Sequence, residues 1–207
     1  PDILLTRSQI DGILDADWID DIPARLDSAT IAQWHGLTDR LPEVVDSAAL
    51  FARLGIQLSV IDAIPQRGGE IIADLNYPVD ISTIGTHDIV LDSGTPEHVF
   101  HVGQALLTLA SLVNEGGYII QALPLNGFNH GFYNINPTLL VDLYSAEHGF
   151  QLLHLHGYHS LMTQPKVFEV VHHGRFRGVP ENSILVAIAK RIRSVPIKPF
   201  IQRKYRP

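Results

Sequence analysis

The chain has 207 residues, 45% of them hydrophobic, which predicts a single domain with one sizeable core. It has no cysteine, which excludes disulfides and thiolate metal sites and fits a reducing compartment. Its apolar runs are too short for a transmembrane span, and no signal-peptide pattern opens the sequence. We therefore expect a cytoplasmic protein that does not contact membranes.

The charges are unevenly distributed along the chain. The first 189 residues carry 8 cationic and 22 acidic side chains, and the last 18 carry seven cationic side chains and no acidic one. Because an acidic body repels phosphates, we expect no nucleic-acid ligand. We expect the basic C-terminal tail, residues 190–207, to pack on this body or on a neighbouring subunit, which leaves a homo-oligomer open.

Short apolar runs alternate with helical patterns, which is typical of a mostly parallel sheet with helices on both faces. We predict strands at Ile3–Thr6, Gln57–Asp62, Glu70–Ala73, Asp88–Asp92, Tyr118–Leu123, Phe150–Tyr158 and Ile184–Lys190. We predict helices at Ser47–Leu54, Val102–Leu112 and Pro137–His148, with Gly149 as the last helix's C-terminal cap.

Two segments do not follow the alternation. The acidic segment 10–45 contains Trp18 and Trp34 and is longer than an ordinary link between a strand and a helix. We interpret it as an inserted, partly helical element that either covers a ligand cleft or packs at the periphery. Residues 165–180 are predicted to be an irregular loop.

Acidic residues stand at the ends of three successive predicted strands. These are Asp62, Asp74 and Asp92. Each alone is an ordinary helix cap, but in a parallel sheet the strand ends meet at one edge. One carboxylate can accept both hydroxyls of a ribose and another can accept an exocyclic amine, so the three together suit a nucleoside.

Five motifs carry a resemblance to a known family. "VID", "IIADLNYPV", "DIVLDSGTPEHVF", "ALLTLASLVNEGGYIIQALP" and "NHGFYNINPTLLVDLY" resemble the successive motifs of class I S-adenosylmethionine-dependent methyltransferases. The likeness is strongest to a sparsely characterised bacterial branch with EHVF and HGFY motifs, and it is strong from Leu54 to Tyr144. It implies an α/β, Rossmann-like fold whose seven-stranded, mostly parallel sheet has helices on both faces.

The resemblance also implies that S-adenosylmethionine is the cofactor and assigns residues to it. Asp62 would hold the ribose, and Asp74 with Leu75 would bracket the adenine. The residues beside the methionine moiety would be Asp92, Ser93 and Gly94. The usual glycine-rich turn after the first strand is replaced by Thr6, Arg7, Ser8 and Gln9, which contain no glycine.

Two of the eleven histidines lie in loops that we expect at the cleft. His98 and His130 are candidate catalytic bases, since a neutral imidazole can deprotonate a hydroxyl or an amine; the alternative is that they are hydrogen-bonded structural residues. His154 and His156 alternate on a predicted strand and should share a face. No spacing supplies a third ligand to this pair, so we predict no metal site.

The leading hypothesis is transfer of a methyl group to an oxygen or nitrogen of a small polar metabolite, of the sugar or natural-product type. The alternative is a catalytically degenerate relative that serves as a binding or scaffold protein, because the first turn lacks its glycine. A nicotinamide dehydrogenase is disfavoured, since no G-x-G-x-x-G follows any predicted strand.

Overall fold

A computed structural model describes residues 7–14, 18–23, 45–65, 68–159 and 166–206. By its internal contacts the chain divides into two compact units, residues 1–72 and residues 73–207. None of the helices in the described segments combines the length and apolarity needed to cross a membrane.

The first unit is built around a small apolar cluster. Its elements are α1 (Arg7–Leu14), η1 (Ile19–Asp21), α3 (Ser47–Arg53), β1 (Ile61–Asp62) and β2 (Ile71–Ile72), and the two short strands pair in parallel. Asp46 caps α3, because its side chain accepts a hydrogen bond from the Ala49 N–H at 2.8 Å. The buried side chains of the cluster are Ile10, Ile19, Ile22, Val45 and Leu50.

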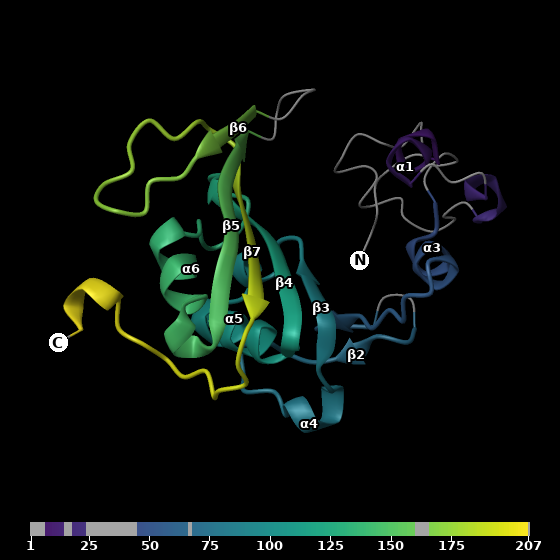
Figure 1. The fold of residues 1–207 in the computed structure, drawn as a ribbon, viewed down its shortest axis with the longest axis horizontal. Helices are drawn as coiled ribbons and strands as arrows, with labels where there is room; N and C mark the ends of the chain where they lie inside the picture. Colours follow the sequence, from purple (N-terminus) through teal and green to yellow (C-terminus); the bar gives the residue numbers. More distant parts are fainter. Residues whose placement is uncertain (1–6, 15–17, 24–44, 66–67, 160–165, 207) are drawn as a thin grey trace. The chain divides into compact units, whose positions relative to one another are not determined.

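The second unit holds the larger sheet (Figure 1). Its strands are β3 (His87–Asp92), β4 (Val113–Asn126), β5 (Phe150–His159), β6 (Lys166–Glu169) and β7 (Ser183–Arg191). Its α-helices are α4 (Ile81–Ile84), α5 (Val102–Ser111) and α6 (Pro137–Leu143). Single 3₁₀ turns form η3 (Pro96–His98), η4 (Ala146–His148) and η5 (Arg203–Tyr205).

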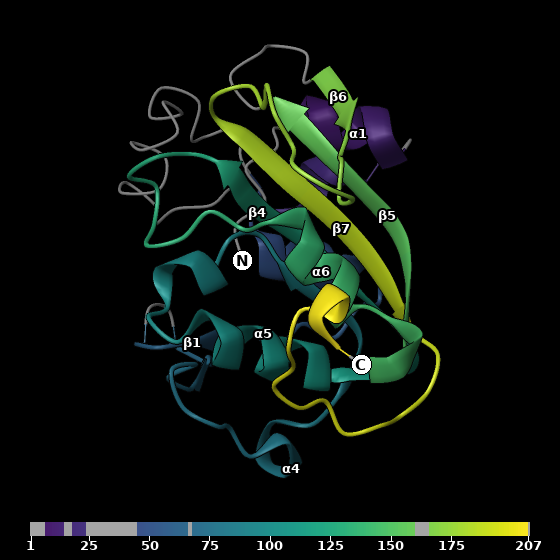
Figure 2. The same ribbon diagram turned by 90° about the vertical axis from the view of Figure 1, so that its left-hand side faces the viewer.

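The sheet topology corrects the predicted fold class. The strand order is β3-β4-β7-β5-β6, and only β3 and β4 pair in parallel; the other three pairings are antiparallel. The expectation of a seven-stranded, mostly parallel Rossmann-like sheet is therefore wrong. The physical reason is β7, which lies between β4 and β5 and runs against both (Figure 2). Burial alternates along β7, and such a pattern records which face is buried but not the direction of the strand.

Individual elements were predicted with mixed success. The strands β3, β5 and β7 and the helices α3 and α5 match within two residues. β1 and β2 are only two residues each, and β6 arises where we predicted an irregular loop. The third predicted helix is divided, since α6 ends at Leu143 and η4 follows; Gly149 then adopts the left-handed conformation expected of a cap.

The predictions for the N-terminal residues can be compared with the structure only in part. The predicted strand Ile3–Thr6 and residues 24–44, including Trp34, lie outside the described residues. Residues 7–9, predicted as a loop after the first strand, form the start of α1. Within segment 10–45, the part of α1 up to Leu14 and η1 are helical; that the segment is an insertion stays a prediction.

Helices α5 and α6 lie on one face of the larger sheet (Figures 1 and 2). α5 buries Leu106 and Leu109, and α6 buries Leu140 and Leu143. The sheet contributes inward-facing side chains to the same core, among them Ile119, Leu123, Leu185, Ala187 and Ala189. This packing fixes the ends of β3 and β4, from which the site loops extend.

Arg191, at the end of β7, is buried and joins three segments. Its Nη1 donates to the backbone oxygens of Val113 at 2.8 Å and Ser111 at 3.2 Å, and its Nη2 donates to that of Val195 at 3.1 Å. The Ser111 oxygen is one of those left without an intrahelical partner at the end of α5. One guanidinium therefore ties α5, β4 and the C-terminal segment together.

The C-terminal tail packs on the second unit. The Arg203 N–H donates to Asp142 Oδ2 at 2.8 Å, and Arg206 forms an ion pair with Glu147. The Phe200 ring lies 4.7 Å from the His148 ring, measured between centroids. Both acidic partners belong to α6 and η4, so the basic tail neutralises part of the acidic body.

We expect Arg191→Met to lower the free energy of unfolding by roughly 2–4 kcal/mol, because it leaves buried carbonyl oxygens without donors. Arg193→Met is the matched control, since the Arg193 side chain is exposed and donates to the Ala146 oxygen; the substitution should cost less than about 1 kcal/mol. Urea denaturation measures both. Equal losses for the two variants would show that Arg191 is not the anchor.

Candidate functional site

A buried hydrogen-bonded chain connects β3, β4 and the residue after α6. In the parallel register Asp92 is the partner of Gln121, so the two side chains emerge side by side. Gln121 Nε2 donates to Asp92 Oδ2 at 2.8 Å, and the Tyr144 hydroxyl donates to Gln121 Oε1 at 2.5 Å. Because the carboxylate can only accept, the amide nitrogen faces it, and the amide oxygen is left for the tyrosine.

The other oxygen of Asp92 shapes the loop after β3. Oδ1 accepts hydrogen bonds from the Gly94 N–H at 3.2 Å and the Thr95 N–H at 3.0 Å. Burial raises the pKa of Asp92, while these donors and Gln121 oppose the rise. Burial also raises the pKa of Tyr144 well above its ordinary value. The network thus folds the segment 93–98 back over the end of the sheet.

This loop is joined to the loop that follows β4. The Phe132 N–H donates to the Glu97 backbone oxygen at 2.8 Å, and the Tyr133 hydroxyl donates to the Phe100 backbone oxygen at 2.8 Å. These contacts place the EHVF and HGFY motifs against each other. His98, from the first motif, and His130, the first residue of the second, consequently lie side by side.

The two imidazoles flank a buried carboxylate. Glu97 is 0% exposed, and its Oε1 lies 3.4 Å from His130 Nε2 and 3.8 Å from His98 Nε2. The side chains of His98 and His130 are 49% and 58% exposed, and their ring centroids are 5.2 Å apart. Neither Glu97 carboxylate oxygen accepts a hydrogen bond of good geometry. The cluster therefore has a polar interior and a side open to solvent.

The environment shifts the titration of two of these groups. Burial raises the pKa of Glu97; the Asp92 carboxylate adds to the rise, and the Glu97 backbone amide and His130 oppose it. Burial lowers the pKa of His98, and the neighbouring His130 lowers it further. At neutral pH the His98 imidazole is therefore uncharged and has a lone pair for a proton or a cation.

Two glycines make room for Glu97. A Cβ on Gly94 would lie 2.7 Å from Glu97 Oε1, and Gly94 also has a φ of +108°. A Cβ on Gly131 would lie 2.8 Å from the Glu97 backbone oxygen. Both distances are shorter than real contacts allow, so the carboxylate occupies a space that only glycine leaves.

Asp74 and Leu75, the residues predicted to bracket the adenine, lie in a turn that is bonded to the residue before α5. Asp74 is exposed, and its Oδ1 accepts from the Asn76 N–H at 2.9 Å and from Asn76 Nδ2 at 2.8 Å. Asn76 Oδ1 in turn accepts from the His101 N–H at 3.0 Å, just before α5. Leu75 is buried. These contacts tie the Asp74 turn to the segment that carries His98.

Other predicted cofactor residues have local partners. In the first unit, Asp62 accepts from the Ile64 N–H at 3.1 Å, and Arg7 Nη1 donates to the Ile19 oxygen at 2.6 Å. Ser8 and Gln9 lie in α1. Thr6 lies outside the described residues, and Ser93 is exposed in the loop after β3. Both carboxylate oxygens of Asp92 accept hydrogen bonds from the protein, so this residue belongs to the buried network.

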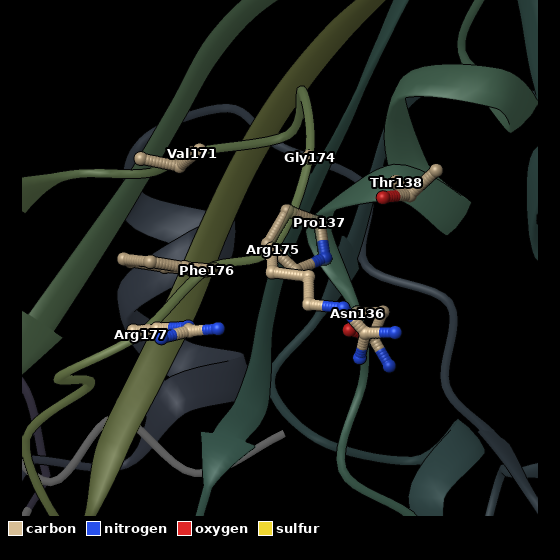
Figure 3. Close-up of a pocket in the computed structure, with 8 residues that line it drawn as sticks. All are labelled: Asn136, Pro137, Thr138, Val171, Gly174, Arg175, Phe176 and Arg177. Atoms are coloured by element: carbon tan, nitrogen blue, oxygen red, sulfur yellow. The ribbon is translucent and has the colours of Figure 1, made fainter.

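The other histidines do not form a comparable site among the described residues. His154 and His156 share a face of β5, as predicted, with ring centroids 4.3 Å apart, but no third ligand joins them. His172 and His173 stand beside a cavity of about 690 Å³. A neighbouring cavity of about 450 Å³ lies between the start of α6 and a loop that carries Arg175 (Figure 3). These residues make an open, basic surface.

Sequence reasoning named the two imidazoles but missed the acid between them. Glu97 stands in the EHVF motif, but the motif assigns it no role, and an acid in a loop usually faces solvent. Gln121 and Tyr144 have no role in the sequence-based prediction. One feature of the sequence could have predicted the buried network: Gln121 stands inside an apolar strand, and a buried amide needs hydrogen-bond partners.

No family model matches the chain, and no curated protein sequence matches it. The assignment of a function therefore depends on the motifs and on the geometry of the cluster.

We expect Gln121→Leu to lower the free energy of unfolding by roughly 2–5 kcal/mol, because it leaves the buried Asp92 Oδ2 and the Tyr144 hydroxyl without partners. Gln104→Leu is the control: Gln104 is half-buried on α5 and donates only to the Thr108 hydroxyl. Gln104→Leu should lower the free energy of unfolding by less than about 1 kcal/mol. Guanidinium denaturation compares the two, and a loss as small as the control's would contradict a structural role for the chain.

Proposed function

We propose that the chain is an S-adenosylmethionine-dependent methyltransferase that acts on an oxygen or nitrogen of a small metabolite. The observation that carries the proposal is the cluster of Glu97, His98 and His130, which joins the EHVF and HGFY motifs at one point. The proposal does not require a seven-stranded sheet. It rests on the loops after β3 and β4, whose mutual contacts the hydrogen bonds define.

The cofactor would supply an electrophilic methyl group on a sulfonium. An acceptor lone pair forms the bond to the methyl carbon, the carbon–sulfur electron pair passes to sulfur, and the acceptor loses a proton. The residues of this chain position the acceptor in line and provide for the proton. We assign the acceptor side to His98 and His130, because both rings reach solvent beside a fixed carboxylate.

On the cofactor side, the Asp74 carboxylate fits an adenine amine, since the side chain is exposed and both its hydrogen bonds use Oδ1. We do not assign Asp92 to the cofactor, because its oxygens are engaged by the network.

Exposed aromatic side chains bear on the class of acceptor. Phe100, Phe128 and Phe132 are exposed on the same two loops as the histidines. They offer apolar surface next to the polar cluster. An acceptor of the natural-product type, with an apolar part beside its hydroxyl or amine, suits this surface better than a bare sugar.

One observation favours the alternative, a binding or scaffold protein. Three of the residues that replace the glycine-rich turn, Arg7, Ser8 and Gln9, begin helix α1, and Arg7 donates a hydrogen bond to the Ile19 oxygen within the first unit. Binding of S-adenosylhomocysteine separates the two functions, because a scaffold has no need of it.

We expect calorimetry to detect S-adenosylhomocysteine binding to the wild type, and Asp74→Ala to weaken it by roughly tenfold. Asp74→Asn should do less harm, because an amide oxygen still accepts. Asp80→Ala is the control: Asp80 is an exposed helix cap bonded to Ser82, so its removal should leave the affinity unchanged. No detectable heat from the wild type at millimolar ligand would favour the scaffold instead.

A further inference from the structure

Three side chains converge in the loops after β3 and β4, and their chemistry is that of metal ligands. One ligand atom from each of Glu97, His98 and His130 lies within 4.8 Å of the other two. Across the described segments, no other group of three or more such side chains comes together in this way. Two imidazoles with one carboxylate suit first-row divalent cations such as Zn²⁺, Mn²⁺ and Fe²⁺.

The state of Glu97 points independently to a positively charged partner. The side chain is fully buried, and neither of its oxygens accepts a hydrogen bond of good geometry; the nearest groups that can carry positive charge are the two imidazoles, at 3.4 and 3.8 Å. A buried carboxylate that accepts no hydrogen bond is unfavourable, and Gly94 and Gly131 leave the space that it occupies. A cation bound at Oε1 would supply the missing interaction.

Two of the three ligand–ligand distances are close to those around a bound cation, and the third, between the two imidazoles, is within 4.8 Å. With metal–ligand distances of about 2.1 Å, tetrahedral ligands lie about 3.4 Å from one another. Glu97 Oε1 and His130 Nε2 already have this separation, at 3.4 Å. His98 Nε2, at 3.8 Å, must approach by a few tenths of an ångström, which rotation of a half-exposed ring allows.

We propose that Glu97, His98 and His130 bind a first-row divalent cation and leave at least one coordination position open to solvent. Three protein ligands with an open position are characteristic of catalytic rather than structural zinc sites. The exposed rings provide the path by which the cation enters.

The role of the cation rests on the proposed function. An acceptor hydroxyl bound at the open position would lose its proton to water more readily, because the cation stabilises the oxygen anion. The acceptor's lone pair would then attack the methyl carbon. In that arrangement His98 and His130 are ligands, and neither takes the proton.

The test is titration of the metal-free full chain with Zn²⁺, followed by calorimetry, with no S-adenosylmethionine present. We expect the wild type to bind one Zn²⁺ at this site. Glu97→Gln should weaken this binding by about a hundredfold or more, and His130→Ala by about tenfold or more. His156→Ala is the control, because it removes a histidine from the pair on β5 and should leave the affinity unchanged.

A second readout reports the open position. The Co²⁺-loaded wild type should show visible absorption bands that change on addition of azide, a small anion that occupies a free coordination position. Glu97→Gln should show neither the bands nor the change at the same Co²⁺ concentration. Thermal melts in a chelator confirm that each variant is folded.

Equal Zn²⁺ affinities for the wild type and Glu97→Gln would overturn the site, as would loss of binding in His156→Ala alone. Cation binding and S-adenosylhomocysteine binding are measured separately, so either can fail without the other. If Zn²⁺ binding alone is absent, the proposed methyl transfer stands and an imidazole takes the proton directly. If S-adenosylhomocysteine binding alone is absent, the cation site stands and the proposed methyl transfer does not.

Discussion

The buried chain from Tyr144 through Gln121 to Asp92 is the constraint on which the site depends. It connects the residue after α6, the central strand β4 and the end of β3 inside an apolar core. Because each member has few ways to satisfy its hydrogen bonds there, the arrangement has one favourable solution. That solution leaves Asp92 Oδ1 pointing at the backbone of the next loop, so the core determines where Glu97 lies.

The same loop holds a group that stability alone would not select. Neither carboxylate oxygen of the buried Glu97 accepts a hydrogen bond, whereas both oxygens of Asp92, a few residues earlier, accept one. A buried carboxylate without hydrogen bonds destabilises a fold, and such groups concentrate at functional sites. The contrast between these two acids separates the part of the loop that supports the structure from the part that is available to a ligand.

The sequence predicted the local elements of the second unit better than their arrangement. Apolar runs located β3, β5 and β7 and the helix α5 closely, because burial imposes a period on each. Strand direction leaves no such mark, and β7 therefore was not recognised as the strand that runs against β4 and β5. At the site, the motifs pointed to His98 and His130 but gave Glu97 no role, because its burial depends on how the loops after β3 and β4 pack together, which no local pattern records.

The most direct measurement is the free energy of unfolding of Glu97→Gln against the wild type, at pH 8 in the presence of a chelator. If Glu97 is an unpaired buried carboxylate kept for a ligand, the neutral amide should be at least as stable, by roughly 0–3 kcal/mol. The side chain keeps its size, so packing against Gly94 and Gly131 is unchanged. A loss of more than about 1 kcal/mol would show that the carboxylate stabilises the fold, and the central claim would fail.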